Sequence, residues 1–226
     1  MTEVIVSIHQ PNYLPYLGFF DKIKQSDVFV LLDNVQFLRA DTKHGFYHRN
    51  RIRTPQGWMW LTLPIKREFK VNIHQAKLAD DKWKEKHWKA IKFNYENSPF
   101  WSKYSPFLQD YYQKEHKILS QATIPVIKWM AEQLGIKCKI LIASEMDLDE
   151  SLHATDRLIE IIKKLGGTTY IAGKLGKDYM EVDKFPQNGI KLVFQDYKHP
   201  EYKQNFSGFV PYLSAIDYLF NTGGTL

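Results

Sequence analysis

The first residues whose types and spacing suit chemistry form a short polar turn near the start of this 226-residue sequence. They follow an apolar, β-branched run at residues 3–8 and precede an amphipathic run that begins at Leu17. Ligands bind at the carboxyl ends of strands in open α/β sheets, and a helix N-terminus there favours anions. Imidazole titrates near neutrality, so the histidine of this turn, His9, is a candidate for proton transfer. The alternative is a rigid turn in which the histidine bonds only to backbone. The candidates are His9, Gln10, Pro11, Asn12 and Tyr13.

A second polar segment, Asp33-Asn34-Val35-Gln36-Phe37, follows the next apolar run at residues 27–32. Its carboxylate and amides suit a sugar hydroxyl, an amine or a metal ion. We therefore take Asp33 as a catalytic candidate and Gln36 as a substrate-binding candidate. The alternative is a plain turn, which Asp-Asn forms well.

Basic residues gather in the polar stretch between residues 33 and 54. Arginine forks match phosphate oxygens, so we expect Arg49 and Arg51 to bind an anionic substrate. The alternative is an exposed hairpin. The whole group is Lys43, His44, His48, Arg49, Arg51 and Arg53.

Two further loops each follow a predicted strand. In "TTYIAGKLGKDYM", glycines let backbone amides approach a phosphate and lysines neutralise it, although the spacing matches neither the Walker nor the GxGxxG pattern. In "QDYKHPEYKQNF", a histidine suits proton transfer, and a tyrosine and a glutamine suit binding. The alternatives are a surface turn and a loop anchored by its aromatic residues. The candidates are Gly173, Lys174, Gly176, Lys177, His199, Tyr202 and Gln204.

Other kinds of site lack their sequence signatures. The eight histidines show no HExxH or paired Cys/His spacing, so we predict no metal site. There is no GxSxG nucleophile motif, and the single cysteine, Cys138, starts an apolar run and is expected to be inert.

Composition narrows the class of partner. Hydrophobic residues make up 44% and charged residues 25%, which are globular values. The net charge is +6, but lysines alternate with acids in stretches such as "DDKWKEKHWKAIKF", which is typical of a solvated helix face. We therefore expect no DNA partner and favour an anionic small molecule such as a nucleotide-sugar. No apolar run approaches bilayer length and no secretory signal is evident, so we expect no membrane insertion and a cytoplasmic location.

The order of predicted elements indicates the fold. Strand, short helix and strand over residues 3–32 form a parallel βαβ unit, and residues 17, 20, 23 and 24 lie at helical spacing. Later strands and helices alternate, and the end of the chain reads as a helix with a glycine stop. We predict one α/β domain over residues 1–226 with a mainly parallel open sheet, and a mainly helical insertion at about 80–135. Further strands are expected at 57–65, 138–144, 168–173 and 190–197, helices at 151–166 and 211–224, and breaks in the insertion near Pro99, Pro106 and Pro125.

Several motifs together resemble the WbqC-like protein family. They are "IHQPNYLPYLGFFDKI", "DNVQF", "WLTLP", "TTYIAGKLGKDYM" and "HPEYKQNFSGFVPYLSAIDYLFNTGG", and the resemblance runs from about Val4 to Gly224. It implies an enzyme of surface-polysaccharide (O-antigen) precursor synthesis. The activity that it suggests is glycine transfer to an amino sugar.

The opening βαβ unit also resembles nucleotidyltransferase-type α/β folds, which implies a HUP-like core. Those folds carry HxGH at the helix start, whereas "HQPNYLPYLG" has no second histidine. The two resemblances favour transfer of an aminoacyl group, such as glycyl, to the amine of a nucleotide-linked amino sugar. Amide formation needs an activated carboxyl, which implies either ATP with Mg²⁺ or an aminoacyl-tRNA donor. The alternatives are a nucleotidyltransferase or other acyltransferase on the same fold, and a non-catalytic binding module of polysaccharide assembly.

Overall fold

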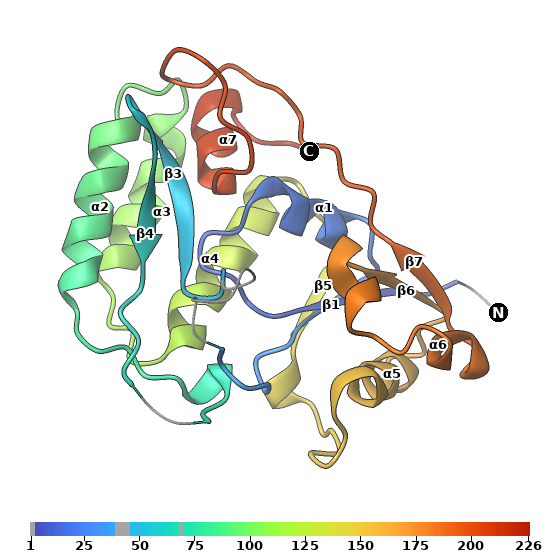
Figure 1. Cartoon of the computed structure of the whole chain (residues 1–226). Helices are drawn as coiled ribbons and strands as arrows, with labels where there is room; N and C mark the ends of the chain where they lie inside the picture. Colours follow the sequence, from blue (N-terminus) through green and yellow to red (C-terminus); the bar gives the residue numbers. More distant parts are fainter. Residues whose placement is uncertain (1–2, 39–45, 68–69) are drawn as a thin grey trace. The chain divides into compact units, whose positions relative to one another are not determined.

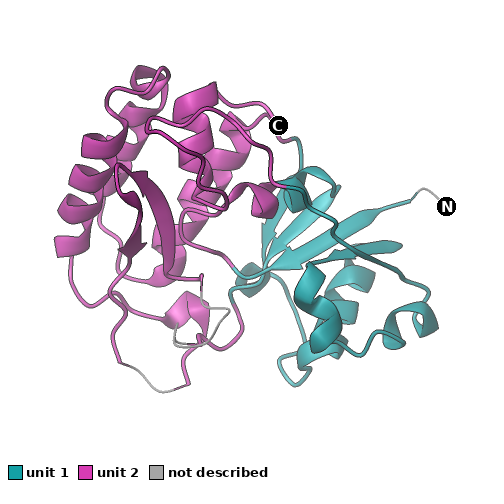
Figure 2. Ribbon diagram, turned by 45° about the horizontal axis from the view of Figure 1, so that its top comes forward, with its two compact units in different colours: residues 1–10, 21–33, 137–198 teal, residues 11–20, 34–136, 199–226 magenta. Residues whose placement is uncertain are grey.

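The computed structural model describes residues 3–38, 46–67 and 70–226, and the chain forms two compact units (Figure 2). Unit 1 comprises residues 1–10, 21–33 and 137–198, and unit 2 comprises residues 11–20, 34–136 and 199–226. Each unit is therefore built from three separate stretches of chain. Whether the two units amount to one domain with an insertion, as the sequence predicts, stays a prediction.

Unit 1 is built on a five-stranded parallel sheet (Figure 1). The strand order is β5-β2-β1-β6-β7. The strands are β1 (Ile5–His9), β2 (Val28–Leu31), β5 (Lys139–Ile142), β6 (Thr169–Ala172) and β7 (Lys191–Phe194). The predicted α/β class with a parallel open sheet of the HUP-like kind is confirmed, and β1 and β2 pair in parallel as the first βαβ unit requires.

The apolar runs of unit 1 explain why its sheet is parallel. β6 is buried along its whole length, and the middles of β1 and β2 are buried too, whereas the edge strands β5 and β7 are half-buried. Strands covered on both faces need continuous apolar sequence, and parallel strands need helical crossovers to cover them. The helix α5 (Ala154–Lys164) supplies such a cover through the buried stripe Leu158, Ile161 and Ile162.

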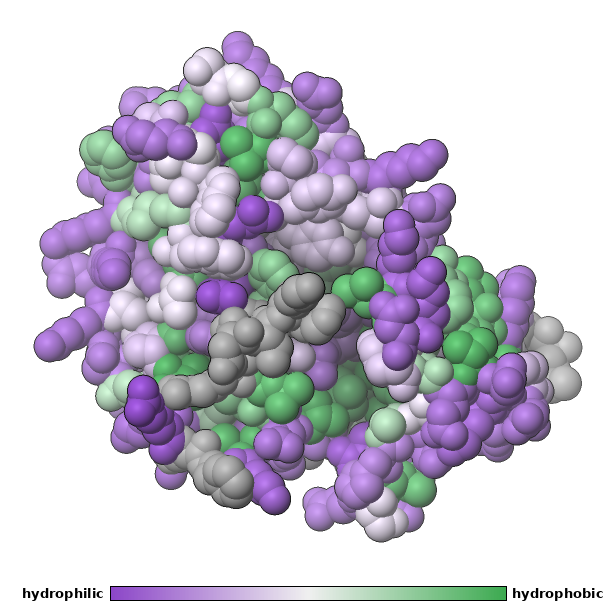
Figure 3. Space-filling view, viewed as in Figure 1, coloured by the Kyte–Doolittle hydropathy of each residue, from purple (hydrophilic) through white to green (hydrophobic). Residues whose placement is uncertain are grey.

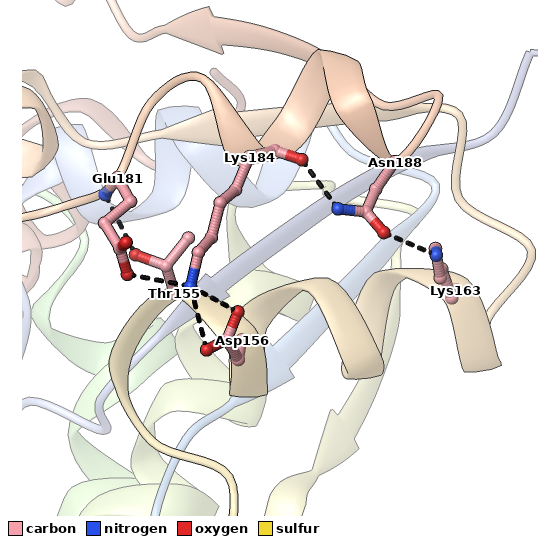
Figure 4. Close-up of polar contacts among 6 residues, drawn as sticks. All are labelled: Thr155, Asp156, Lys163, Glu181, Lys184 and Asn188. Carbon is pink, nitrogen blue, oxygen red and sulfur yellow. Dashed lines mark hydrogen bonds and ion pairs between the residues drawn. The ribbon is translucent and has the colours of Figure 1, made fainter.

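A polar clasp holds the short helix α6 (Lys184–Gln187) to α5 (Figure 4). The Lys184 ammonium lies 2.8 and 3.0 Å from the two Asp156 carboxylate oxygens and 3.0 Å from Glu181. The backbone N–H of Glu181 donates to Thr155 Oγ1 at 3.0 Å. Because α6 follows the glycine- and lysine-bearing loop after β6, the clasp fixes the far end of that loop.

Unit 2 combines a two-stranded hairpin with helices. The hairpin pairs β3 with β4 in antiparallel register. Aromatic rings fill the interior between the helices; Tyr95 and Phe220, for example, stack with their centroids 5.1 Å apart. The elements are β3 (Arg49–Thr54), β4 (Gly57–Thr62), α2 (Lys82–Tyr95), α3 (Trp101–Gln113), α4 (Leu119–Gln133) and α7 (Ala215–Thr222), with 3-10 turns at Ile73–Gln75 in unit 2 and at Ala143–Glu145 and Lys174–Asp178 in unit 1. The eight-residue helix α1 (Leu17–Lys24) belongs to unit 2 up to residue 20 and to unit 1 beyond it.

Two of the three breaks predicted in the helical segment are wrong. The chain does break near Pro99, between α2 and α3, but Pro106 and Pro125 lie inside α3 and α4. Proline has no backbone N–H, so the carbonyl four residues before it in a helix loses its usual hydrogen-bond donor. For Pro125 that carbonyl belongs to Gln121, and it lies 3.1 Å from His116 Nδ1, while His116 Nε2 lies 2.9 Å from the Tyr111 carbonyl oxygen.

Of the other local predictions, some are confirmed and some are wrong. The terminal helix α7 is confirmed, with Ser214 as its N-cap and Gly223 in the left-handed region at its C-cap. The strand β3 was predicted only within the alternative of an exposed hairpin for the basic run, because its alternating polar residues lack an apolar run. In α1 the sequence placed Lys24 on the apolar spacing, but Lys24 is exposed and Lys22 is the buried lysine.

Among the described residues, no helix is both long enough and apolar enough to cross a membrane.

Candidate substrate site at the carboxyl edge of the parallel sheet

The carboxyl edge of the sheet in unit 1 gathers several of the predicted site residues. Because all five strands are parallel, the residues that follow them meet at one edge: His9 ends β1, Asp33 follows β2, and Gly173 with Lys174 follows β6. The chain runs from β1 outward to β2 and β5, then returns to the other side of β1 as β6. The strand order therefore reverses between β1 and β6, which is the place where open α/β sheets bind ligands.

His9 stands at this reversal point with its tautomer fixed by the backbone. Its Nδ1 lies 2.9 Å from the carbonyl oxygen of Gln10, which can only accept, so Nδ1 carries the proton and Nε2 carries the lone pair. Burial, and secondly the nearby Lys22 ammonium, lower the pKa of His9 to about 3. At neutral pH His9 is therefore an uncharged hydrogen-bond acceptor, and a weaker base than the sequence implied.

Lys22 is a buried lysine that sequence reasoning missed. Its side chain is 2% exposed, and its ammonium donates to the carbonyl oxygen of Ile8 at 2.9 Å and lies 5.7 Å from the Phe29 ring. Within the described residues, no carboxylate pairs with it. Burial lowers its pKa to about 7. No signal in the sequence marks it, since α1 is apolar on most of its faces and only packing shows which lysine points inward.

Both carboxylate oxygens of Asp33 accept hydrogen bonds from within the protein. Its side chain is 1% exposed, Oδ1 accepts from the Ser144 backbone N–H at 2.8 Å, and Oδ2 accepts from the Ser144 hydroxyl at 2.7 Å. Because β2 and β5 pair with Leu31 opposite Ile142, the two residues lie side by side just past their strands. Asp33 thus ties two loops of the edge together, and its proposed catalytic role stays a prediction.

The loop after β6 presents open space and positive charge. Gly173 has an ordinary φ of −66°, and a Cβ built on it would meet nothing within 4 Å. Neither conformation nor packing therefore requires glycine there, which leaves room for a ligand to approach the backbone. Gly176 differs, because a Cβ there would lie 2.7 Å from Met180. Lys174 and Lys177 are both exposed.

The remaining predicted residues lie in unit 2, and two of them point into its interior. Tyr13 is fully buried, and its hydroxyl lies 2.9 Å from His87 Nδ1 and 2.7 Å from the Tyr112 hydroxyl. Asn12 is 7% exposed, and its Oδ1 has no hydrogen-bond partner. Pro11 is buried, and Gln36 is exposed.

Gln204 and Tyr202 belong to a closed polar cluster around Asp217. The Gln204 amide donates to Asp217 Oδ2 at 2.8 Å and to the Val210 carbonyl, while its oxygen accepts from Arg53 Nε and the Val210 N–H. Tyr202 donates to Asp217 Oδ2 at 2.7 Å. Every hydrogen-bonding group of Gln204 is therefore used within unit 2.

His199 lies beside this cluster. Its Nε2 accepts from the Tyr212 N–H at 3.4 Å, its ring centroid lies 4.9 Å from that of Tyr212, and burial lowers its pKa. The substrate roles proposed for His199, Tyr202 and Gln204 stay predictions.

The basic run splits between interior and surface. Arg53 is 2% exposed, and its guanidinium donates to backbone carbonyls that include Gly57 and Ser207. Arg49 and Arg51 occupy the other positions on the same side of β3, where they are half-buried and lie over tryptophan rings. Lys43 and His44 lie outside the described residues. In the part of the chain that the structure describes, no three acidic, histidine or cysteine side chains form a metal-binding group.

Comparison with known proteins gives two matches. A model described as the WbqC-like protein family matches residues 10–225. "Uncharacterized protein Rv1507c" of Mycobacterium tuberculosis (strain ATCC 25618 / H37Rv) is 31% identical over 222 residues, which cover 96% of this chain and 94% of that protein. No solved structure matches significantly.

Proposed function

The chain belongs to the WbqC-like protein family, and from this premise we propose that it is an enzyme of surface-polysaccharide precursor synthesis. It transfers an aminoacyl group, such as glycyl, to the amine of a nucleotide-linked amino sugar. The observation that carries the proposal is the reversal of strand order between β1 and β6, with His9 on one side and the open Gly173–Lys174 backbone on the other. The family resemblance supports the choice of acyl transfer.

The anionic part of the substrate is assigned to the loop after β6. Gly173 leaves the backbone accessible, and the exposed Lys174 and Lys177 supply two positive charges. Phosphate oxygens accept hydrogen bonds from both backbone amides and ammonium groups. This loop is also held at its far end by the clasp between α5 and α6 (Figure 4), which limits the ordering that substrate binding must impose.

The reaction forms one C–N bond and breaks one C–O bond. The neutral sugar amine attacks the activated carbonyl carbon, the leaving group departs with the C–O electron pair, and the nitrogen gives up one proton. His9 offers its Nε2 lone pair to an N–H of the amine and orients it. Because the pKa of His9 is about 3, His9 does not keep the proton at neutral pH, and solvent takes it.

An activated carboxyl comes from either of two donors. ATP would activate the acid as an acyl-adenylate, and its phosphates fit the Gly173–Lys177 loop for the reasons given above. The described residues offer no carboxylate group suited to Mg²⁺, since both Asp33 oxygens accept from Ser144, so no residue is assigned to that ion. An aminoacyl-tRNA is the other donor.

The first experiment measures melting temperature with ATP and a panel of nucleotides and nucleotide-sugars. A ligand at a hundred times its Kd stabilises the folded state by about 2.7 kcal/mol, so binding is readily seen. We expect a shift for at least one nucleotide-sugar, and its loss in Lys174→Ala/Lys177→Ala. The matched control is Lys139→Ala/Lys191→Ala, which removes the same charge from the opposite, amino edge of the sheet. No shift with any ligand, or equal loss in both double variants, would overturn the site.

A second experiment identifies the reaction by mass spectrometry. Glycine is supplied either with ATP or as glycyl-tRNA, together with an amino sugar-nucleotide that shifts the melting temperature. A new amide is the expected product. AMP without an amide would favour a nucleotidyltransferase, and ligand binding without any product would favour a binding module.

A further inference from the structure

The outer face of the β3–β4 hairpin in unit 2 carries an alternation of guanidinium groups and tryptophan rings. The Arg49 guanidinium carbon lies 4.5 Å from the Trp60 ring centroid. That of Arg51 lies 5.0 Å from Trp58 and 5.8 Å from Trp60. Significant cation–π pairs occur roughly once per 70–80 residues, whereas these three all lie within residues 49–60. We call this set of four residues the Arg/Trp face.

The hairpin register produces the alternation. Arg51 stands directly opposite Trp60, and Arg49 and Trp58 occupy the next same-face positions along their own strands. The other side of the hairpin carries Ile52 and Leu61, which are buried. Period-two patterning therefore places Ile52 and Leu61 on one side and the four members of the Arg/Trp face on the other. Arg53, opposite Trp58, shares the second side but is 2% exposed and donates to the Ser207 carbonyl, so the Arg/Trp face is the part of that side which is not covered there.

The Arg/Trp face is accessible and positively charged. Trp58 is 45% exposed, and Tyr212, whose backbone carbonyl accepts from Arg51 Nη2 at 3.3 Å, is 49% exposed. Arg51 is half-buried, it pairs with no carboxylate among the described residues, and its buried Nε has no hydrogen-bond partner. Figure 3 shows pale side chains between deep-purple ones on the surface over β3 and β4. A charge without an acidic partner beside open rings is complementary to an anion that carries its own rings.

The spacing selects a polymer over a single small ligand. Residues two apart on a strand are separated by about 6.8 Å, so Arg49 and Arg51 repeat at that interval. Neighbouring phosphates along an extended single strand of nucleic acid repeat at a similar interval, and each carries a base that can stack on an aromatic ring. Proteins that hold single strands combine positive charge with stacking rings in this way.

We infer that the Arg/Trp face binds single-stranded RNA, with phosphates on Arg49 and Arg51 and a base stacked on Trp58. Within the proposed function, on which this reading of the partner rests, the RNA is the unpaired 3′ end of an aminoacyl-tRNA. The Arg/Trp face would then bind the tRNA that donates the aminoacyl group, and this enzyme would not need ATP. An RNA duplex fits poorly, since its bases stack on one another and leave no ring for Trp58.

The test is fluorescence anisotropy with a labelled single-stranded ribo-oligonucleotide that ends in CCA. Loss of one stacking ring and one phosphate contact is expected to weaken binding roughly tenfold or more in Arg51→Ala/Trp58→Ala. The matched control is Lys92→Ala/Phe93→Ala, which removes one cation and one exposed ring from α2, and it should change the Kd less than about twofold. Arg51→Lys keeps the charge but not the planar fork, so an intermediate loss is expected. Melting temperatures check that every variant is folded.

Three results would overturn the inference. They are no binding by the wild-type protein at low salt, equal affinity for a duplex of the same sequence, and equal weakening in the α2 control. The proposed function is judged separately from its amide product. If glycine with ATP gives the amide while the oligonucleotide does not bind, the transferase stands and the RNA inference falls. If the oligonucleotide binds and neither glycyl-tRNA nor glycine with ATP gives an amide, the Arg/Trp face stands and the transferase proposal falls.

Discussion

Two buried ionisable side chains, one in each unit, differ in how many hydrogen-bond partners surround them. Asp217 in unit 2 is fully buried, and it accepts hydrogen bonds from Tyr95, Tyr202 and Gln204. Burial raises its pKa, and those bonds oppose the rise. Lys22 in unit 1 is almost as enclosed, but among the described residues its ammonium has one carbonyl acceptor and no carboxylate partner. Burying a charge costs little stability only when hydrogen-bond partners replace water. We therefore expect Asp217 to stabilise unit 2, and the Lys22 ammonium beside the candidate site to destabilise unit 1.

The comparison is tested most strongly by Lys22→Met. The pKa of Lys22 is about 7 in the folded protein and about 10.5 in the unfolded chain, so the unfolded state binds more protons between these values. Stability therefore rises with pH across that window, and below pH 7 the lysine costs about 5 kcal/mol. We expect Lys22→Met to raise the melting temperature of unit 1 at pH 6 and to lose this advantage near pH 10, as followed by calorimetry.

Lys24→Met is the control for this prediction. It removes an exposed lysine two residues away on the same helix, so its melting temperature should follow the wild type at both pH values. A less stable Lys22→Met at pH 6 would show that the ammonium is well compensated, and the contrast with Asp217 would then disappear.

Asp217→Ala is expected to act in the opposite direction. It leaves the Tyr95, Tyr202 and Gln204 donors without their acceptor and removes a negative charge that interacts with Arg53, which should cost unit 2 about 4 kcal/mol. Urea unfolding followed by tryptophan fluorescence measures this loss in unit 2 alone, because all six tryptophans belong to that unit.

Asp217→Asn separates the charge of this residue from its hydrogen bonds. It keeps one acceptor oxygen, so we expect a smaller loss of stability than in the alanine variant. If both variants unfold at the wild-type urea concentration, the cluster around Asp217 does not contribute to the framework.

Ser144→Ala tests the smaller tie at the sheet edge. It removes the 2.7 Å hydroxyl bond to Asp33 and keeps the backbone bond, so a loss of about 1 kcal/mol in unit 1 is expected. If Asp33 only joins the two loops, nucleotide-sugar binding should stay within about twofold of wild type. A much larger loss of binding at unchanged stability would show that the Asp33 carboxylate meets the substrate directly.

The sequence predicted most of the elements of unit 1 because its strands are short, continuously apolar and separated by helical patterns. The same reasoning gave β3 only as an alternative, an exposed hairpin, because its polar side chains form a strand only by pairing with β4. It also predicted breaks at Pro106 and Pro125, which lie inside α3 and α4, since a local rule for proline does not include the tertiary packing of the two helices. For the site, residues that follow strands were found, whereas Lys22 and Ser144 were not.

The sequence by itself determined the α/β alternation, the family, and the group of polar residues that the parallel strands bring to one edge. These follow from local pattern and from the rule that parallel strands end together. Only the tertiary structure decided which polar residues face inward. Arg53 bonds to Gln204, which lies far away in sequence, and Gln204 bonds to Asp217. Arg51 and Trp58 lie on the hairpin surface, and Lys22 is enclosed without a carboxylate partner among the described residues. Burial depends on neighbours far away in sequence, and no local pattern encodes those neighbours.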